Sequence, residues 1–363
     1  MRLMVKIVVF FLSFQIFSLI AANFQGEIKV LFLHSYPPSE WPEMITKGTI
    51  DNLEKNFRHK ISYEEFYLGN ELLDKVFANY QEKKLIIYKD LINQFRVNFQ
   101  EKVAAYKPDY VIVSDDEAVF LVQDILPKIS GKIYFTGINS LPESSLFLDR
   151  RILEKYNYIN ETIPIENTVS ILKKYSEIEN ILVLTSEGFS SKIIAENLRG
   201  KKDIYLDKHK IKKMDFIISS QFKDWEKCVK NAHKNYDLLI VLVPYHVVDN
   251  NKKEVGLMKI GDLLDNNLKI PSLGISPIHI KMGMLMGVCP SPYYLGKQVS
   301  ELVISEINNV LKRSGPVYNI YNELQVNQGV LKKFPIFNRP ELTEIINLQG
   351  KLSIKEKNKE YSK

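Results

Sequence analysis

Short runs of branched and aromatic residues alternate with longer amphipathic segments from Glu27 onward. Such runs predict buried strands, and the segments of helical period predict helices that cover them. In the first half, the predicted strands are Ile28 to His34, Ile61 to Phe66, Tyr110 to Ser114 and Lys132 to Thr136. The predicted helices between them are Pro42 to Asn56, Asn70 to Lys107 with a break, and Asp116 to Leu126.

A second series of the same kind begins after Ile163. Its predicted strands are Asn180 to Thr185, Lys212 to Ile217, Leu238 to Val243 and Pro271 to Gly274. Its predicted helices start near Ile163 and run to Tyr175, then cover Ser190 to Arg199, Phe222 to Asn235, Val255 to Asn267 and Pro292 to Arg313. Alternation of this kind is typical of a parallel sheet with helices on its faces.

The fold class predicted from these two series is α/β, with two Rossmann-like lobes built on parallel sheets. The chain has 363 residues, more than one core usually supports, which agrees with two lobes. We expect an N-terminal lobe over residues 27–140 and a C-terminal lobe over 160–275. The lysine-rich residues 350–363 are expected to form a polar tail.

The first 22 residues resemble an export signal in their charge and hydropathy. Arg2 and Lys6 precede an unbroken apolar stretch from Ile7 to Phe14, and Ala21 and Ala22 close the segment. This pattern predicts cleavage near Ala22 and a mature protein in the periplasm. A retained membrane anchor is the alternative, although polar residues interrupt the apolar stretch before it reaches the length of a span.

The charge and the cysteines limit the function classes. The net charge of +6 is mild and the lysine pairs are scattered among acidic and polar residues, which argues against a nucleic-acid partner. Cys228 and Cys289 lack the CxxC spacing of a redox or zinc site, so we expect two separate thiols, with a bridge as the alternative.

Ligands of open parallel sheets bind outside the carboxyl ends of the strands, so the loops there hold the candidate residues. After the first strand, the hydroxyl of Ser35 is a candidate donor, and Tyr36 and Trp41 are candidates for stacking on a planar ligand. The alternative for the serines of this loop is helix capping, which suits Ser39 before Pro42.

Two adjacent carboxylates follow the strand that ends at Ser114. We expect one of Asp115 and Asp116 to cap the next helix and the other to hold an ammonium group. A divalent metal or general-acid work is the alternative for the pair. Asn139, after the next strand, offers both a donor and an acceptor, or stabilises its own turn.

The second half supplies a matching set of loop residues. Ser186 and Ser190 flank a strand-to-helix turn suited to an anionic group, and Phe189 closes an apolar side. Tyr245 and His246 follow an apolar strand, where they either face a ligand or pack within the loop.

Catalytic and cofactor motifs are absent from the sequence. There is no GxSxG, no GxxxxGK[ST], no HExxH and no histidine cluster at metal-ligand spacing. We therefore expect no enzyme activity, no cofactor and no metal. A hydrolase built by tertiary contact from Ser35, a histidine and an aspartate remains an open alternative.

Three segments carry a resemblance to a known family. VLFLHSYPPSEWPEMITKG, KPDYVIVSDDEAV and GKIYFTGIN resemble, in order and rough spacing, the ABC-transporter substrate-binding proteins of the type I periplasmic-binding-protein fold and related sensor domains. The segments IPSLGIS and Tyr293 to Gly296 resemble late parts of that family, but methionines and Cys289 stand where its paired glycines are expected.

The resemblance implies two lobes joined by about three crossing segments, near Asn139 to Glu161, Pro271 to Pro290 and Pro316 to Gln328. Residues 290–320 would complete the first lobe and 323–345 the second. It also implies a periplasmic solute-binding protein that closes on a small polar, amino-acid-like or aromatic ligand and delivers it to an ABC permease. A membrane sensor kinase as partner, or a periplasmic hydrolase, are the alternatives.

Overall fold

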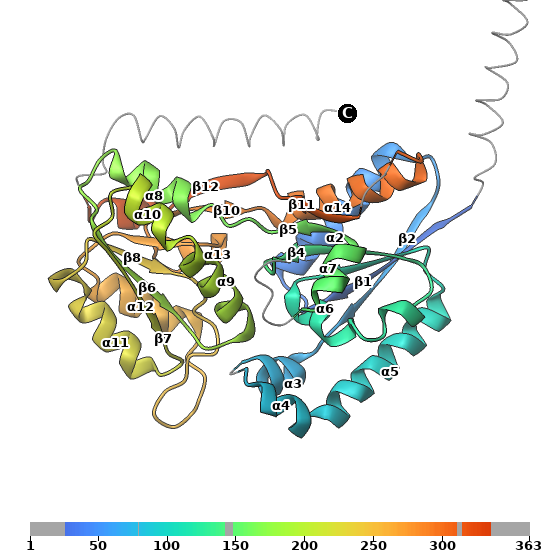
Figure 1. Cartoon of the computed structure of the whole chain (residues 1–363), viewed down its shortest axis with the longest axis horizontal. Helices are drawn as coiled ribbons and strands as arrows, with labels where there is room; N and C mark the ends of the chain where they lie inside the picture. The colour runs from blue at the N-terminus through green and yellow to red at the C-terminus, as the bar shows by residue number, and fades with distance from the viewer. Residues whose placement is uncertain (1–25, 79, 142–147, 311–313, 335–363) are drawn as a thin grey trace, which may run out of the picture.

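The computed structural model describes residues 26–78, 80–141, 148–310 and 314–334 (Figure 1). The chain forms two α/β lobes, each built on a six-stranded sheet, which confirms the predicted fold class. The expected signal segment 1–22 and the polar tail 350–363 lie outside the described residues. No described helix is long and apolar enough to cross a membrane.

The first sheet is entirely parallel and has the order β11-β5-β4-β3-β1-β2. Its central strands are buried on both faces, which explains their continuous apolar sequences. The strands are β1 (Ile28–His34), β2 (Ile61–Tyr67), β3 (Tyr110–Ser114), β4 (Lys132–Ile138), β5 (Asn157–Asn160) and β11 (Gly315–Tyr318).

The second sheet has the order β12-β10-β9-β8-β6-β7, and only its edge strand β12 is antiparallel to its neighbour. The strands are β6 (Asn180–Thr185), β7 (Lys213–Ile218), β8 (Leu238–Val241), β9 (Ser272–Gly274), β10 (Met286–Pro290) and β12 (Asn322–Val326). Cys228 and Cys289 are free and buried in this lobe.

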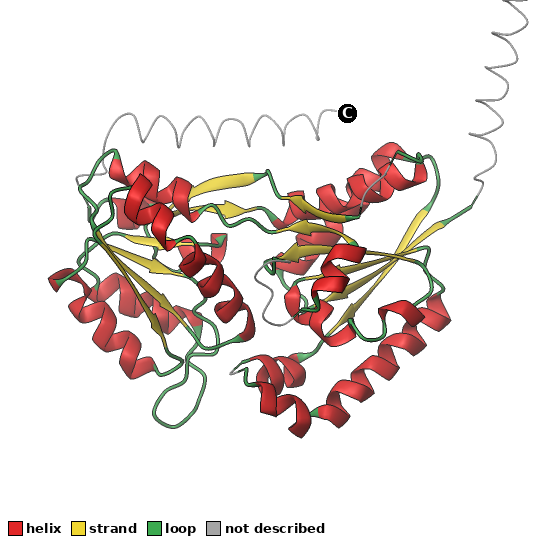
Figure 2. Cartoon of the chain, in the orientation of Figure 1, coloured by secondary structure: helices red, strands yellow, loops and turns green. Residues whose placement is uncertain are grey.

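Helices cover both faces of each sheet (Figure 2). The first half contains α2 (Glu40–Asn56), α3 (Asn70–Leu72), the π-helical turn η1 (Leu73–Phe77), α4 (Glu82–Ile87), α5 (Lys89–Tyr106), α6 (Asp116–Val122), η2 (Leu126–Lys128) and α7 (Arg150–Lys155). The rest contains α8 (Ile165–Lys173), α9 (Phe189–Gly200), α10 (Lys202–Lys208), α11 (Phe222–Asn231), η3 (Ala232–Lys234), α12 (Leu257–Asn267), α13 (Pro277–Lys281), α14 (Pro292–Ile307) and α15 (Gln328–Leu331).

Three segments of the described chain connect the lobes. The chain leaves the first sheet after β5, returns to it from β10 through α14, and leaves again between β11 and β12. The expected crossing at Pro271 to Pro290 is wrong for most of its length, because β9 and β10 are buried strands of the second sheet. The first expected crossing, Asn139 to Glu161, includes β5, which is a strand of the first sheet. Residues 142–147 of this segment lie outside the described part of the chain.

Helices α2 and α14 pack with their backbones in close contact, which anchors the returning chain on the first lobe. A Cβ on Gly48 would lie 1.9 Å from the carbonyl oxygen of Tyr293, and one on Gly296 would lie 2.0 Å from that of Ile45. The Thr49 hydroxyl also donates to the Gly296 carbonyl at 3.0 Å. Only glycine permits this approach, because the atoms that a Cβ would meet belong to the backbone and cannot move aside as the end of a flexible side chain can.

We predict that Gly48→Ala lowers the free energy of unfolding by about 3 kcal/mol, because the new methyl forces two helix backbones apart. Gly200→Ala is the matched control, since nothing lies within 4 Å of its added Cβ and the residue is helical. Urea denaturation of both variants measures the difference. Equal stability of the two variants would contradict the close packing.

Candidate functional site

Three consecutive acidic residues begin α6, immediately after the buried strand β3. Asp115, Asp116 and Glu117 are 4%, 0% and 4% exposed. β3 is buried along its whole length and so is α6, so the acids at the junction between them lie in the interior. Buried carboxyl groups need partners, and those partners differ among the three residues.

Asp115 holds an unusual backbone conformation, with φ +69°. Its carboxylate accepts hydrogen bonds from Trp41 Nε1 and Ser114 Oγ, both at 3.1 Å. A Cβ on Gly137 would lie 2.8 Å from Asp115 Oδ1, so the neighbouring strand must carry glycine there. Burial, followed by the charge of Glu117, raises the pKa of Asp115 well above its usual value.

Asp116 stabilises the turn after β4. Its carboxylate accepts from the backbone N–H groups of Asn139 at 2.8 Å and Ser140 at 3.0 Å. These bonds partly oppose the rise in its pKa that burial causes. Both oxygens of Asp116 therefore hold backbone amides of its own lobe in place. The donors to Asp115 are instead the side chains of Trp41 and Ser114, which makes Asp115 the better candidate for an ammonium group.

Glu117 connects the two lobes. It accepts a hydrogen bond from Tyr36 Oη at 3.3 Å in its own lobe and another from the Ser190 hydroxyl, at the start of α9 in the second lobe. Burial, with a smaller contribution from the negative charge of Asp116, raises the pKa of Glu117 to about 7, against the lowering effect of the Ser190 hydrogen bond. Its charge therefore changes near neutral pH.

Glu161 adds a further carboxyl group from the segment that leaves the first sheet. It accepts from Asn139 Nδ2 at 3.3 Å. Burial and then the charges of Asp115 and Asp116 raise its pKa well above the usual value. Asn139 is itself linked to the second lobe, because Asn197 Nδ2 in α9 donates to its carbonyl oxygen at 2.8 Å.

The acid cluster, defined here as Asp115, Asp116, Glu117 and Glu161, has no basic partner among the described residues. The ion pairs in the described ranges all involve other carboxylates. The positions of the four groups are stabilised by neutral donors only. The cluster is therefore suited to protons or to a positively charged ligand.

The serines of the predicted site use their hydroxyls inside the protein. Ser35 Oγ donates to the Ser114 carbonyl and accepts from the Ala118 N–H, each at 2.9 Å, so it stabilises the first turn of α6. Ser186 Oγ lies 2.8 Å from Ser191 Oγ, and both residues are buried. The partners of Ser35 are backbone groups and not an imidazole.

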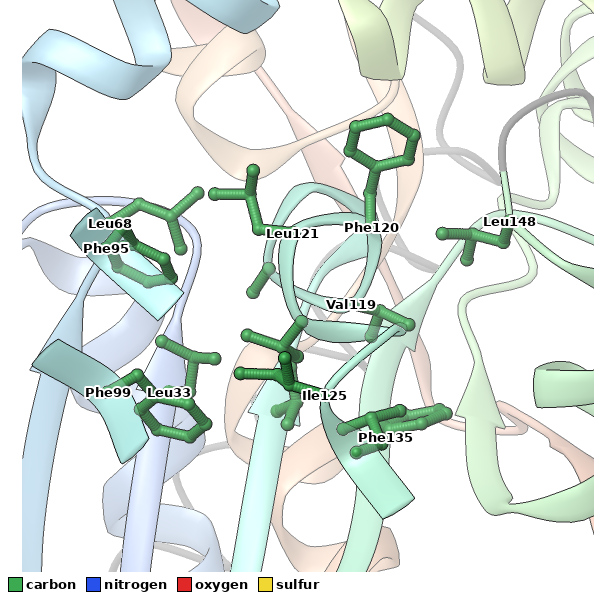
Figure 3. Close-up of a cluster of buried hydrophobic side chains, with 14 of the residues drawn as sticks. Leu33, Leu68, Phe95, Phe99, Val119, Phe120, Leu121, Ile125, Phe135 and Leu148 are labelled. Atoms are coloured by element: carbon green, nitrogen blue, oxygen red, sulfur yellow. The ribbon is translucent and has the colours of Figure 1, made fainter. Parts of the chain in front are cut away.

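Phe189 joins the two lobes through an aromatic cluster. Its ring centroid lies 5.1 Å from that of Phe77, 5.0 Å from that of Tyr80 and 5.1 Å from that of Phe120. Figure 3 shows Phe120 on α6 pointing away from Ile125 and Phe135 of the first-lobe core. Lys192 Nζ, also in α9, donates to the Tyr80 carbonyl at 2.5 Å. Closure of the lobes therefore buries aromatic surface.

The structure separates Tyr245 from His246. Tyr245 is 37% exposed, its ring lies 6.2 Å from that of His279, and its charge would act on Tyr36 across the lobes. His246 instead lies beside Asp74 and Glu254. In the described part of the chain, that trio is the one set of three side chains with ligand atoms close enough for a metal ion, and the acid cluster does not meet that condition.

Of the predicted residues, Tyr36, Trp41, Asp115, Asp116, Asn139 and Ser190 lie in or against the acid cluster. Sequence reasoning missed Glu117 and Glu161. Glu117 follows Asp115 and Asp116 directly, so three acids between an apolar strand and an apolar helix were a usable signal. Glu161 had no comparable signal, since it follows a short strand that was not predicted.

The comparisons with known proteins find structural likeness but no relative by sequence. No family model and no curated protein matches the chain. The ABC domain in complex with L-Trp from Streptococcus pneumonia has a TM-score of 0.59 at 13% identity, over 88% of this chain and 98% of that one. The ligand-free, open substrate-binding protein CD0873 from Clostridium difficile has a TM-score of 0.54 at 16% identity, over 84% and 94%.

A LacI-type transcriptional regulator described as putative, from Bacteroides fragilis, also matches, with a TM-score of 0.52 at 11% identity over 85% of this chain and 99% of that one. Identities this low establish the fold alone. The chain therefore has the two-lobed fold shared by type I periplasmic binding proteins and LacI-type regulators.

Proposed function

We propose that this protein binds a small molecule with a protonated amine between its two lobes, as a solute-binding protein. The observation that carries this proposal is the acid cluster, in which Asp115, Asp116 and Glu117 are buried, Glu161 is partly buried, and none of the four has a described basic partner. An ammonium ion supplies the missing charge, and buried carboxylates bind it strongly because water does not screen the interaction.

The aromatic residues around the cluster favour an amino-acid-like or aromatic ligand. Tyr36 and Trp41 donate to Glu117 and Asp115, so their rings are fixed beside the proposed ammonium position. Ring faces attract cations and also pack against apolar groups. The match to a protein in complex with L-Trp supports this ligand class.

Closure of the lobes would transmit the binding event. Ser190, Asn197 and Phe189 of α9 all contact the first lobe, so any ligand that favours this arrangement shifts the hinge equilibrium toward it. Three linking segments suit such a rotation.

The remaining parts of the proposal rest on the sequence. The N-terminal pattern supports export to the periplasm, and the family resemblance supports delivery of the ligand to an ABC permease, without enzymatic turnover. A membrane sensor kinase is the alternative partner. The mild charge argues against nucleic acid, although regulators share the fold. Neighbouring genes for a permease and an ATPase, or for a kinase, would distinguish the two partners.

We predict that an amino acid or aromatic amine raises the melting temperature of the purified protein, because a ligand that binds only the folded state stabilises it. The screen pairs each compound, beginning with L-tryptophan, with its N-acetyl derivative, which lacks the positive charge. Only the free amines should bind and be recovered unchanged. Equal shifts by acetylated compounds, or consumption of the compound, would contradict the proposal.

Asp115→Asn should weaken binding of the best amine by about tenfold or more, since it removes a buried negative charge. Asparagine has the same shape as aspartate, so the variant changes the charge of this side chain and leaves its size unchanged. Asp124→Asn, at a 68% exposed side chain paired with Arg96, is the matched control and should bind as the wild type does. Equal losses in both variants would argue against a specific ammonium site.

We also predict that the unliganded protein loses stability as pH rises. The pKa of Glu117 is raised from 4.5 to about 7, so the folded state binds more protons and its advantage disappears as pH passes through 7. Asp115 and Glu161 act in the same direction. Burial lowers the pKa values of His34, His246 and His279 in the folded state, so these residues act in the opposite direction until the unfolded imidazoles have lost their protons, about one pH unit above 6.5.

Urea denaturation at pH values of about 6.5 and 8.5 tests this prediction. The ionisation of Glu117 alone should lower the free energy of unfolding by about 1 kcal/mol over that interval. Glu117→Gln should remove that part of the pH dependence of stability. Glu101→Gln, at an exposed residue of α5, is the control and should keep the wild-type dependence. An equal pH dependence of the wild type and Glu117→Gln would show that the Glu117 carboxyl group is already charged at a pH of about 6.5.

A further inference from the structure

His246 and Glu254 lie on a short hairpin of the second lobe, and Asp74 faces them from η1 of the first lobe. The ligand atoms of these three side chains lie within 4.8 Å of one another. Figure 1 shows the hairpin as the gold loop at the bottom of the view, on the side of α3, whereas the linking strands β10, β11 and β12 are at the top. The trio is therefore far from the hinge.

The hairpin fixes two of the three side chains relative to each other. Val248 and Glu254 form an antiparallel bridge, and Val255 N–H donates to the Val247 carbonyl at 2.7 Å. Val247 and Val255 are buried, which attaches the hairpin to the core of the second lobe. The Glu254 carboxylate accepts from His246 N–H at 3.1 Å and lies 3.7 Å from its Nδ1 atom.

Asp74 lies beside His246 and Glu254, and no described basic side chain neutralises its carboxylate. It forms no ion pair or hydrogen bond through its side chain within the described residues, and the adjacent Lys75 pairs with Glu71 at 2.6 Å. Closing the lobes thus brings two carboxylates from different lobes together beside one imidazole. Their repulsion opposes closure unless a cation lies between them.

We propose that Asp74, His246 and Glu254 form a zinc site that holds the lobes together at the end opposite the hinge. One imidazole nitrogen with two carboxylate oxygens suits Zn²⁺, with water as the fourth ligand, better than Mg²⁺ or Ca²⁺, which prefer oxygen alone. Zinc bonds of about 2.0–2.2 Å need ligand atoms closer than 4.8 Å. A rotation of the exposed Asp74 side chain supplies that movement.

The site lies on the side of the molecule away from the linking segments (Figure 1). A metal here acts at a distance from the linking segments, so a weak interaction has a large effect on the opening angle. The zinc site shares no residue with the acid cluster, and its existence does not depend on the proposed amine ligand.

The test is calorimetric titration of the untagged protein with ZnCl₂, together with small-angle X-ray scattering with and without the metal. We expect one zinc ion per chain and a smaller radius of gyration in its presence, reversed by EDTA. Asp74→Asn, His246→Asn and Glu254→Gln should each weaken binding by about tenfold or more. Asparagine at 246 keeps the φ of +59° while it removes the imidazole.

His209→Asn is the matched control. His209 Nε2 lies 3.0 Å from Glu166 within one lobe, beside Lys208, which already supplies the cation. This variant should bind zinc as the wild type does. Melting temperatures in EDTA verify that each variant folds. Unchanged zinc affinity in His246→Asn would overturn the site. Loss of affinity in His246→Asn with none in Asp74→Asn, or binding without compaction, would overturn its role between the lobes.

Discussion

The arrangement of the two lobes depends on the acidic side chains that are buried where β3 ends. Each of these side chains needs a hydrogen-bond donor, and the donors come from several elements of both lobes. Asp115, Asp116 and Glu117 enter the interior because β3 before them and the remaining residues of α6 after them are buried. Each then takes a neutral donor from a different element: an indole N–H, a pair of backbone amides, and hydroxyls from both lobes. A missing donor would leave a buried charge uncompensated, so these elements must keep their positions.

Lobe closure combines this polar contact with an apolar one. The Glu117 contact to Ser190 is specific in direction, and it is weaker while the carboxyl group is protonated than when it is charged. The contact of Phe189 with Phe77, Tyr80 and Phe120 is non-directional and gains free energy from burial. A cationic ligand would displace protons from the acid cluster and balance the resulting negative charge. Its binding would add to both the polar and the apolar contact. The proposed zinc site would add a third contact at the opposite end from the hinge.

The sequence predicted the fold well where strands are buried on both faces. The bounds of β1, β3 and β6 agree with the prediction because a central parallel strand needs apolar residues at every position. It missed β5, β10, β11 and β12. Of these, β5, β11 and β12 have the short and partly polar sequences NYIN, GPVY and NELQV and lie next to the linking segments. β11 pairs with β5 and β12 pairs with β10, which are strands far away in the sequence, so their pairing leaves no periodic signal.

The same limit applies to the candidate site. Asp115 and Trp41 were predictable from strand ends, since parallel strands place their following loops at one edge. The contact between Glu117 and Ser190 was not, because residues 73 positions apart meet only when the lobes close. His246 was assigned to the ligand site from its position after β8, but the hairpin that follows directs it toward Asp74 and Glu254.

The most direct measurement of the central claim is the number of protons exchanged when the best amine binds at neutral pH, obtained by calorimetry in buffers of different ionisation enthalpy. If the acid cluster binds protons until an ammonium group arrives, binding should release about one proton or more per ligand. Glu117→Gln should reduce that number. Binding without proton release would contradict the account, because the acid cluster would then be ionised already or lie away from the amine.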